Sequence, residues 1–253
     1  DELRRFGAEV IEQNATLVAY DNTLLQSVNI IGSYNSTAKT RILLLAHWDC
    51  RPYSDNDPNP ANYHTPVMGA DDGASGVGVL LEMARQIGQK LPTVGIDIIF
   101  LDAEDYGQPS FYKGEENEDS WCLGTQYWAR NPHQLNYRAR YGVLLDMVGA
   151  YGATFPKERV SMTYAAYVVE KIWNKAQQLG YGNYFLNKEG GAITDDHLYV
   201  NEIIGIPCAD IINYGDNGFA SHWHTINDTM DNIDKQTLKA VGQTLLEVIY
   251  AEE

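Results

Sequence analysis

The sequence predicts an α/β fold with a mostly parallel central β-sheet flanked by helices. Short apolar runs alternate along the chain with longer segments of helical periodicity, which is the pattern of parallel strands joined by crossover helices. Acidic residues or histidines follow, or lie within, four of these runs, and ligands bind beyond the carboxyl ends of the strands in open α/β sheets. The chain has 253 residues, enough for one domain with a sizeable core, and no linker divides residues 1–253. We therefore expect a single catalytic domain.

The first half of the chain is expected to contain two helices, three strands and a long loop. In chain order these are residues 2–14 (helix), 26–33 (strand), 41–46 (strand), 51–66 (loop), 77–87 (helix) and 96–101 (strand). Apolar residues three and four positions apart predict the two helices. Short apolar runs predict the strands, the first of them near an edge of the sheet. Asp, Asn and Pro dominate the loop, which is long enough to be functional.

The second half repeats this alternation. In order we expect residues 106–120 (loop), 121–130 (helix), 141–148 (strand), 161–179 (helix), 206–213 (strand), 215–219 (turn) and 235–250 (helix). Gly180 is expected to end the long helix before it. The strand 141–148 carries an acid, Asp146, in its interior, and a carboxylate there needs a partner when it is buried.

Composition limits the kinds of partner. The net charge of −16 argues against nucleic acid and anionic membranes, and no apolar run is long enough to span a bilayer. Three cysteines, Cys50, Cys122 and Cys208, allow at most one intrachain disulfide, and their pairing stays open. The chain opens at Asp1 without Met or a signal peptide, as a mature or trimmed product would.

Acids and histidines are expected to converge at one edge of the sheet. The stretch 96–105 begins as a strand and ends with Asp102, Glu104 and Asp105, whose mutual repulsion needs a cation, a proton or water. Parallel strands end at the same edge, so the other such groups can meet them there. These groups are His47 and Asp49, Asp71 and Asp72, Asp146, and the 222–224 segment. Convergent Asp, Glu and His suit a divalent metal, above all zinc. Each group alone is more typical of a solvated turn or a structural histidine.

The ordered set of motifs resembles the zinc aminopeptidase superfamily and, within it, the animal-type glutaminyl cyclases with their bacterial members. The resemblance runs from about Arg41 to the last helix. Its motifs are His47-Trp48-Asp49, Gly69-Ala70-Asp71-Asp72, Asp102-Ala103-Glu104-Asp105, Leu145-Asp146-Met147, Asp195-Asp196-His197 and Trp223-His224-Thr225.

Nine residues are expected to form the site, and this resemblance implies eight of them. They are the zinc ligands Asp72, Asp105 and His224, the catalytic residues Glu104, Asp146 and Asp195, the pocket aromatics Trp223 and Phe219, and Trp121, which we add as an aromatic residue of the neighbouring loop that could cap the pocket. One zinc ion is expected. Asp105 departs from the animal enzymes, which usually carry Glu there. His47 matches a ligand of the second metal in the aminopeptidases but not in the cyclases.

The implied activity converts N-terminal Gln of peptides or proteins into pyroglutamate and releases ammonia. Asp195, where the aminopeptidases usually carry a small hydroxyl residue, and Trp223 before His224 favour the cyclase. Two alternatives stay open, a dizinc aminopeptidase and a non-catalytic peptide-binding module. A monomer located in the periplasm, or otherwise outside the cytoplasm, is expected.

Overall fold

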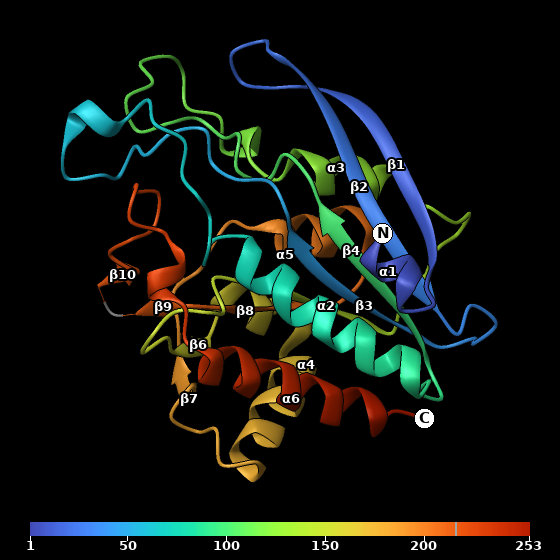
Figure 1. The fold of residues 1–253 in the computed structure, drawn as a ribbon. Helices are drawn as coiled ribbons and strands as arrows, with labels where there is room; N and C mark the ends of the chain where they lie inside the picture. Colours follow the sequence, from blue (N-terminus) through green and yellow to red (C-terminus); the bar gives the residue numbers. More distant parts are fainter. Residues whose placement is uncertain (216) are drawn as a thin grey trace.

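A six-stranded mixed β-sheet forms the centre of the computed structural model, which describes residues 1–215 and 217–253 (Figure 1). The strand order is β1-β2-β4-β3-β5-β8. These strands are β1 (Glu9–Val18), β2 (Leu24–Tyr34), β3 (Arg41–His47), β4 (Gly95–Leu101), β5 (Tyr141–Asp146) and β8 (Cys208–Ile212). Strands β3, β4, β5 and β8 are parallel to one another. Strand β2 is antiparallel to both of its neighbours, β1 and β4. The predicted fold class is confirmed.

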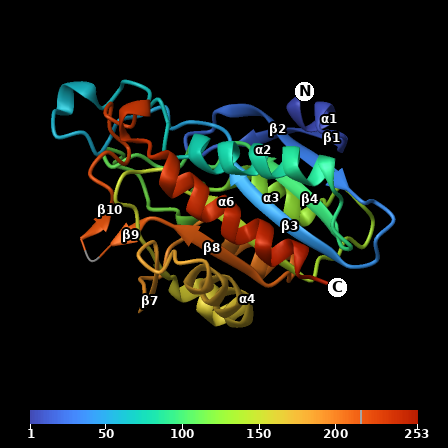
Figure 2. The same cartoon turned by 60° about the horizontal axis from the view of Figure 1, so that its bottom comes forward.

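Helices cover both faces of this sheet (Figure 2). The long helices α2 (Ala74–Gln89), α4 (Arg159–Gln178) and α6 (Lys235–Tyr250) pack on one face, and the shorter α3 (Leu123–Arg130) and α5 (Asp196–Tyr199) lie on the other. Alternation along β3 divides the core between the two faces. Leu44 packs with the long helices, whereas Leu43 and Leu45 pack with Trp128 of α3.

The remaining elements are short. They are helix α1 (Glu2–Arg5), strands β6 (Phe155–Lys157), β7 (Phe185–Glu189), β9 (Tyr214–Gly215) and β10 (Gly218–Phe219), three 3₁₀ turns (Pro60–Asn62, Glu118–Ser120, Met230–Asn232) and a π-helical turn (Val200–Ile204). The expected turn 215–219 connects β9 to β10, and its residue Asp216 lies outside the described residues. In the described part of the chain, every helix is too short or too polar to cross a membrane.

The predicted helix 2–14 is wrong after its first turn. Helix α1 ends at Arg5, and Gly7 follows with a φ of +90°, a conformation that glycine adopts without a steric penalty. The chain then pairs with β2 from Glu9 opposite Ser33 to Val18 opposite Leu24. Cross-strand pairing has therefore overridden the helical spacing of the apolar residues. It also places β1 at the edge, and β2 lies directly beside it, near the edge as expected.

The third apolar run is a shorter strand than predicted. Strand β5 ends at Asp146, so this acid is its last residue and not an interior one. Met147 follows in the left-handed region with a φ of +48°. That turn releases the chain from the sheet and leaves the Asp146 carboxylate at the carboxyl edge.

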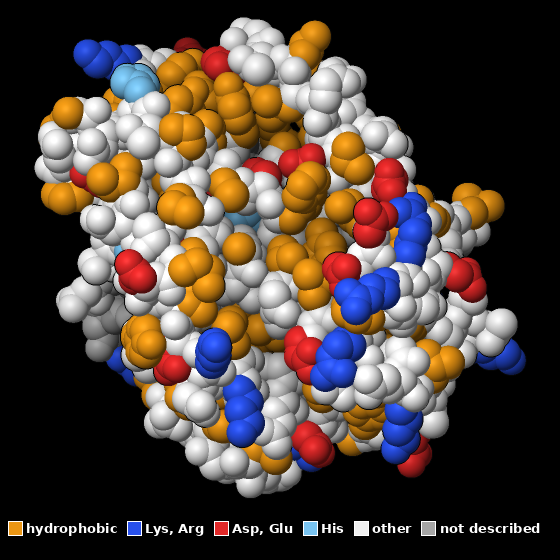
Figure 3. Space-filling view, viewed as in Figure 1, with side chains coloured by type: hydrophobic (Ala, Val, Ile, Leu, Met, Phe, Trp, Pro, Cys, Tyr) orange, Lys and Arg blue, Asp and Glu red, His pale blue; other side chains and the backbone are white. Residues whose placement is uncertain are grey.

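Two long loops extend beyond this edge. The ring centroids of the loop residues Tyr53 and Phe111 lie 5.4 Å apart. The Tyr112 ring packs against Tyr20 at the tip of the β1–β2 hairpin, with 4.9 Å between centroids. Hydrophobic side chains gather over these loops, whereas charged side chains lie mainly over α2 and α6 (Figure 3). The loops are thus held by aromatic packing close to the strand ends.

A buried ion pair ties three central strands together at their opposite edge. Arg41 at the start of β3 forms a two-pronged contact with Asp97 of β4, at 2.6 and 2.7 Å. Asp97 also accepts hydrogen bonds from Ser33 of β2 and from the Tyr137 hydroxyl. Both charged side chains are almost fully buried, so each depends on the other for its charge to be tolerated.

Asp97→Ala is expected to lower the free energy of unfolding by about 3–5 kcal/mol, because it leaves the buried Arg41 charge unpaired. Urea denaturation measures the loss. The control Glu82→Ala removes the exposed Glu82–Arg85 pair on α2 and should change stability by less than about 1 kcal/mol. Equal effects of the two substitutions would contradict a structural role for the buried pair.

Candidate active site

A cavity of about 270 Å³ opens at the carboxyl ends of the parallel strands. Its lining combines acids and one histidine with apolar and aromatic residues. The lining residues are Asp72, Glu104, Asp105, Trp121, Asp146, Met147, Ala192, Ile193, Thr194, Asp195, Ile212, Tyr214, Phe219, Trp223 and His224. All nine site residues expected from the sequence are among them. The structure therefore brings them together, and their individual roles stay predictions.

Asp72, Asp105 and His224 form a compact group of possible metal ligands. Asp72 lies in the glycine-rich turn before α2, Asp105 follows β4, and His224 follows β10. His224 Nε2 lies 3.5 Å from Asp72 Oδ2 and 3.3 Å from Asp105 Oδ1. One donor atom from each side chain lies within 4.8 Å of the other two, and all three side chains are buried.

The charges in this group fit a bound cation. Asp72 Oδ2 is buried without a hydrogen-bond partner among the described residues. Burial, followed by the negative charge of Asp105, raises the pKa of Asp72 well above its ordinary value. Burial also works to raise the pKa of Asp105, but the hydrogen bond and charge of His224 outweigh it and lower that pKa. A divalent cation would offset the repulsion between the carboxylates, and two carboxylates with an imidazole are a donor set typical of zinc.

Further carboxylates position these candidate ligands. Asp228 accepts the backbone N–H groups of Asp71 and Asp72 at 2.9 and 3.0 Å. Asp49 does the same for Glu104 and Asp105, at 3.1 Å each. The turn before α2 and the turn after β4 are each fixed by one side chain, which determines where their own carboxylates point.

The histidine has a support of its own. Asp55 lies 3.7 Å from His224 Nδ1 and forms a buried two-pronged ion pair with Arg51. The Arg51 guanidinium also donates to the carbonyl of Asp105 and lies 4.5 Å above the Trp121 ring. A carboxylate beside the second nitrogen of a metal-binding histidine is a common supporting contact, since it fixes the ring orientation.

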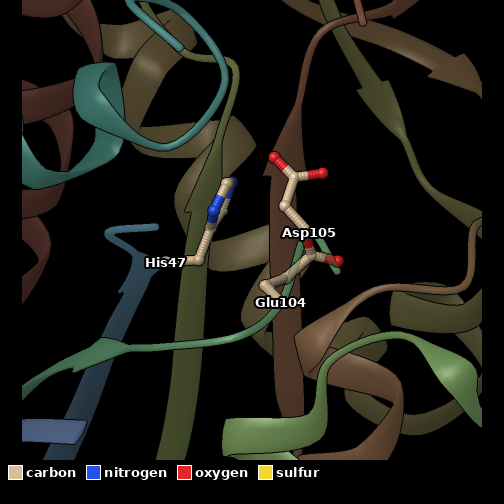
Figure 4. Close-up of side chains that lie close together, drawn as sticks. All are labelled: His47, Glu104 and Asp105. Atoms are coloured by element: carbon tan, nitrogen blue, oxygen red, sulfur yellow. The ribbon is translucent and has the colours of Figure 1, made fainter. Parts of the chain in front are cut away.

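His47 belongs to a second group that shares Asp72. Its Nε2 lies 3.0 Å from Asp72 Oδ1 and 3.2 Å from Asp146 Oδ1. Burial works to lower the pKa of His47, but Asp146, Asp49 and Asp72 outweigh it and raise that pKa well above the usual value. Gly73 leaves room for the ring, because a Cβ there would come within 2.8 Å of His47. His47 and Asp105 extend toward the same side (Figure 4), and one donor atom each from His47, Glu104 and Asp105 lies within 4.8 Å of the other two.

Glu104 and Asp195 lie close together in the cavity, with donor atoms within 4.8 Å of each other. Burial and then the Asp105 charge raise the pKa of Glu104 well above its usual value. Burial and then the Asp146 charge raise the pKa of Asp195 to about 6. Both pKa values are thus shifted toward neutral pH, the direction that suits proton transfer in catalysis.

Aromatic rings build one wall of the cavity. Trp223 stacks on His224 with 3.8 Å between ring centroids, and Phe219 lies 4.1 Å from Trp223. Trp121 also stacks on His224, with 5.9 Å between ring centroids. Tyr214 extends this wall, 4.9 Å from Phe219. Its position directly after a predicted strand was the sequence signal that could have identified it.

Four residues around the cavity have a left-handed backbone although none is glycine. Ala103, Cys122, Met147 and His224 have φ values of 54°, 55°, 48° and 53°. Such conformations are uncommon outside glycine and persist where the surrounding structure enforces them, often at functional sites. No pattern in the sequence indicated these backbone conformations.

The model of peptidase family M28 matches residues 29–249. A Zn-dependent exopeptidase structure from Parabacteroides distasonis is 61% identical and covers 99% of this chain and 87% of that one, with a TM-score of 0.97. The glutaminyl cyclase of Bacteroides thetaiotaomicron, bound to N-acetylhistamine, is 56% identical and covers 100% and 87%, with a TM-score of 0.99. Bovine glutaminyl-peptide cyclotransferase is 28% identical over 243 residues, which are 86% of this chain and 64% of the bovine protein.

His224→Gln is expected to abolish high-affinity Zn²⁺ binding, because it removes one of three candidate ligands. Isothermal titration of the metal-free protein with Zn²⁺ measures the change. The control is His222→Gln, since His222 contacts Asp71 and lies outside the three-residue group. Tight binding in the His224 variant would refute the ligand assignment.

Proposed function

This chain belongs to peptidase family M28, and from that membership and the cavity we infer that it is a zinc-dependent glutaminyl-peptide cyclotransferase. It converts the N-terminal Gln of peptides and proteins into pyroglutamate and releases ammonia. The observation that carries this proposal is that one cavity unites the metal-binding group, Glu104 and the acids Asp146 and Asp195 with an aromatic wall. The similarity to solved bacterial glutaminyl cyclases supports it.

The size and walls of the cavity suit a single N-terminal residue. Its volume of about 270 Å³ is slightly below the range of roughly 300–1,000 Å³ typical of small-molecule pockets. Phe219 and Trp223 confine the side chain of that residue, while the acids face its two nitrogen atoms. Such confinement matters because cyclisation is intramolecular and depends on positioning.

We propose that one zinc ion binds to Asp72, Asp105 and His224. Zinc supplies Lewis-acid polarisation of the side-chain amide oxygen, which makes the amide carbon more electrophilic. Because their backbone N–H groups are held by Asp228 and Asp49, the two carboxylates keep their positions in the free and the occupied site.

Glu104 transfers the proton in this mechanism. The α-amine nitrogen bonds to the side-chain amide carbon, the bond from that carbon to the amide nitrogen breaks, and ammonia leaves. Glu104 accepts one proton from the attacking amine and gives it to the departing nitrogen. Its raised pKa suits a group that must both accept and return a proton.

Asp146 and Asp195 hold the departing nitrogen. Closely spaced carboxylates resist double ionisation, and burial together with the Asp146 charge raises the pKa of Asp195 to about 6, so we propose that the pair shares a proton when the departing nitrogen is bound. The ionised partner then accepts hydrogen bonds from the nitrogen as it becomes ammonia.

A dizinc aminopeptidase is the second candidate, and one observation favours it. His47, Asp72 and Asp146 form a further group with donor atoms within 4.8 Å of one another, so Asp72 could bridge two ions. A peptidase of this kind would activate water between the metals. The short contacts from His47 to Asp72 and Asp146 fit the single-zinc enzyme equally well. In that case His47 would neutralise the two carboxylates in place of a second metal ion.

We also propose that the protein acts as a monomer outside the cytoplasm, where processed N-termini are available. Size-exclusion chromatography with light scattering tests the first part, and cell fractionation tests the second.

Incubation with a Gln-Ala peptide and, separately, with Leu-amide distinguishes the two activities. Ammonia release from the peptide without cleavage of its peptide bond identifies the cyclase, and a decrease in the peptide mass equal to one molecule of NH₃ confirms pyroglutamate. Free leucine from Leu-amide would instead identify the peptidase. Metal analysis of the same sample gives the ratio of zinc to protein.

Glu104→Gln is expected to lower kcat by a factor of about 10²–10⁴, the usual contribution of a general acid–base group, while zinc stays bound. Ammonia release and metal analysis measure the two quantities. Glu116→Gln changes an exposed glutamate of the nearby loop and should leave both unchanged. A Glu104 variant with substantial turnover would remove this residue from the mechanism.

A further inference from the structure

The side chain of Glu104 is contacted by a buried thiol. Cys122 Sγ lies 3.2 Å from Glu104 Oε1, and the cysteine is fully buried. All three cysteines are unpaired, so the Cys122 sulfur carries a proton that it can donate. Among the hydrogen bonds between described residues, this is the one that reaches the Glu104 carboxylate.

The backbone fixes this contact. Cys122 N donates to the carbonyl of Glu104, and Leu123 N donates to that of Ala103, both at 3.0 Å. Cys122 and Ala103 both have the left-handed backbone, so the two turns lie against each other in conformations that the pairing enforces. The thiol consequently has little freedom to leave the carboxylate.

The thiol also lies beside the third acid of the cavity. Donor atoms of Glu104, Cys122 and Asp195 lie within 4.8 Å of one another. Asp195 Oδ2 is buried and has no hydrogen-bond partner among residues 1–215 and 217–253. Burial and then the Glu104 charge raise the pKa of Cys122 well above its usual value, so the thiol stays protonated and does not add another negative charge.

We propose that Cys122 is a positioning residue for Glu104: its S–H group holds Oε1 and thereby leaves the second carboxylate oxygen free for proton transfer in the cavity. This inference rests on the proposed function of Glu104. A carboxylate without such a donor could rotate about its terminal torsion, which has a broad energy minimum. Positioning of this kind raises kcat and leaves substrate binding unchanged.

Steady-state kinetics with a Gln-Ala peptide test the proposal. Cys122→Ala removes the donor and is expected to lower kcat about tenfold, equivalent to about 1.4 kcal/mol, with KM changed less than about twofold. Cys122→Ser retains a donor and should restore kcat to within about threefold of the wild type. The matched control is Cys208→Ala, which removes the other buried thiol, in the core strand β8. Wild-type kcat in Cys122→Ala, or equally slow Ala and Ser variants, would overturn the proposal.

An infrared measurement tests the contact independently of the reaction and of whether Cys122→Ala folds. In the Cys50→Ser/Cys208→Ser background, Cys122 is the sole thiol of the sequence. Its S–H stretching band is expected at the lowered frequency of a hydrogen-bonded thiol and should rise in Glu104→Ala. A band that Glu104→Ala leaves unmoved would refute the positioning role. An inactive wild type with the expected band shift would refute the proposed function alone.

Discussion

Repulsion between buried carboxylates at one edge of the sheet is the constraint on which the site depends. Asp72, Asp105, Asp146 and Asp195 line the same cavity, and such acids are tolerated only where cations, protons or N–H donors offset their charge. The fold supplies part of the offset through His47, His224 and the guanidinium of Arg51. Asp49 and Asp228 do not neutralise the acids; they fix the turns that carry them. The remaining negative charge explains why a metal ion and shared protons belong to the functional state, and why the rest of the site consists of contacts that hold carboxylates in place.

The site residues that lie at strand ends could be predicted from the sequence. The features that depend on tertiary contacts could not. Asp105 could be placed because it follows a short apolar run, and parallel strands put such residues at one edge. Asp146 was recognised only as an acid within a predicted strand, because the sequence did not show that the strand ends there. His224 entered through the likeness of its motif to a known family. The segment 2–14 was misassigned because its apolar spacing fits a helix, whereas pairing with β2 decides its structure. The supporting roles of Asp55 and Asp228 could not be foreseen. In the sequence, an isolated acid in a loop cannot be distinguished from one that is buried beside a metal-binding residue.

Cyclisation and hydrolysis make different demands on the same scaffold. In cyclisation the nucleophile is part of the substrate, so the protein needs one electrophilic centre, one proton carrier and walls that fold the substrate onto itself. Hydrolysis needs a bound and activated water. The aromatic wall of Trp223, Phe219 and Tyr214 beside Glu104 serves the first demand directly. His47 is the residue at which the two chemistries diverge, because it can either ligate a second ion or neutralise the carboxylates around it.

The left-handed conformations of Ala103, Met147 and His224 have a consequence for the evolution of the protein. Each is a position at which glycine would relax the backbone and favour the folded chain locally. Selection for heat resistance alone would favour substitution by glycine at these turns. Such substitutions would loosen the catalytic geometry, so stability and catalysis impose opposite demands on the same residues.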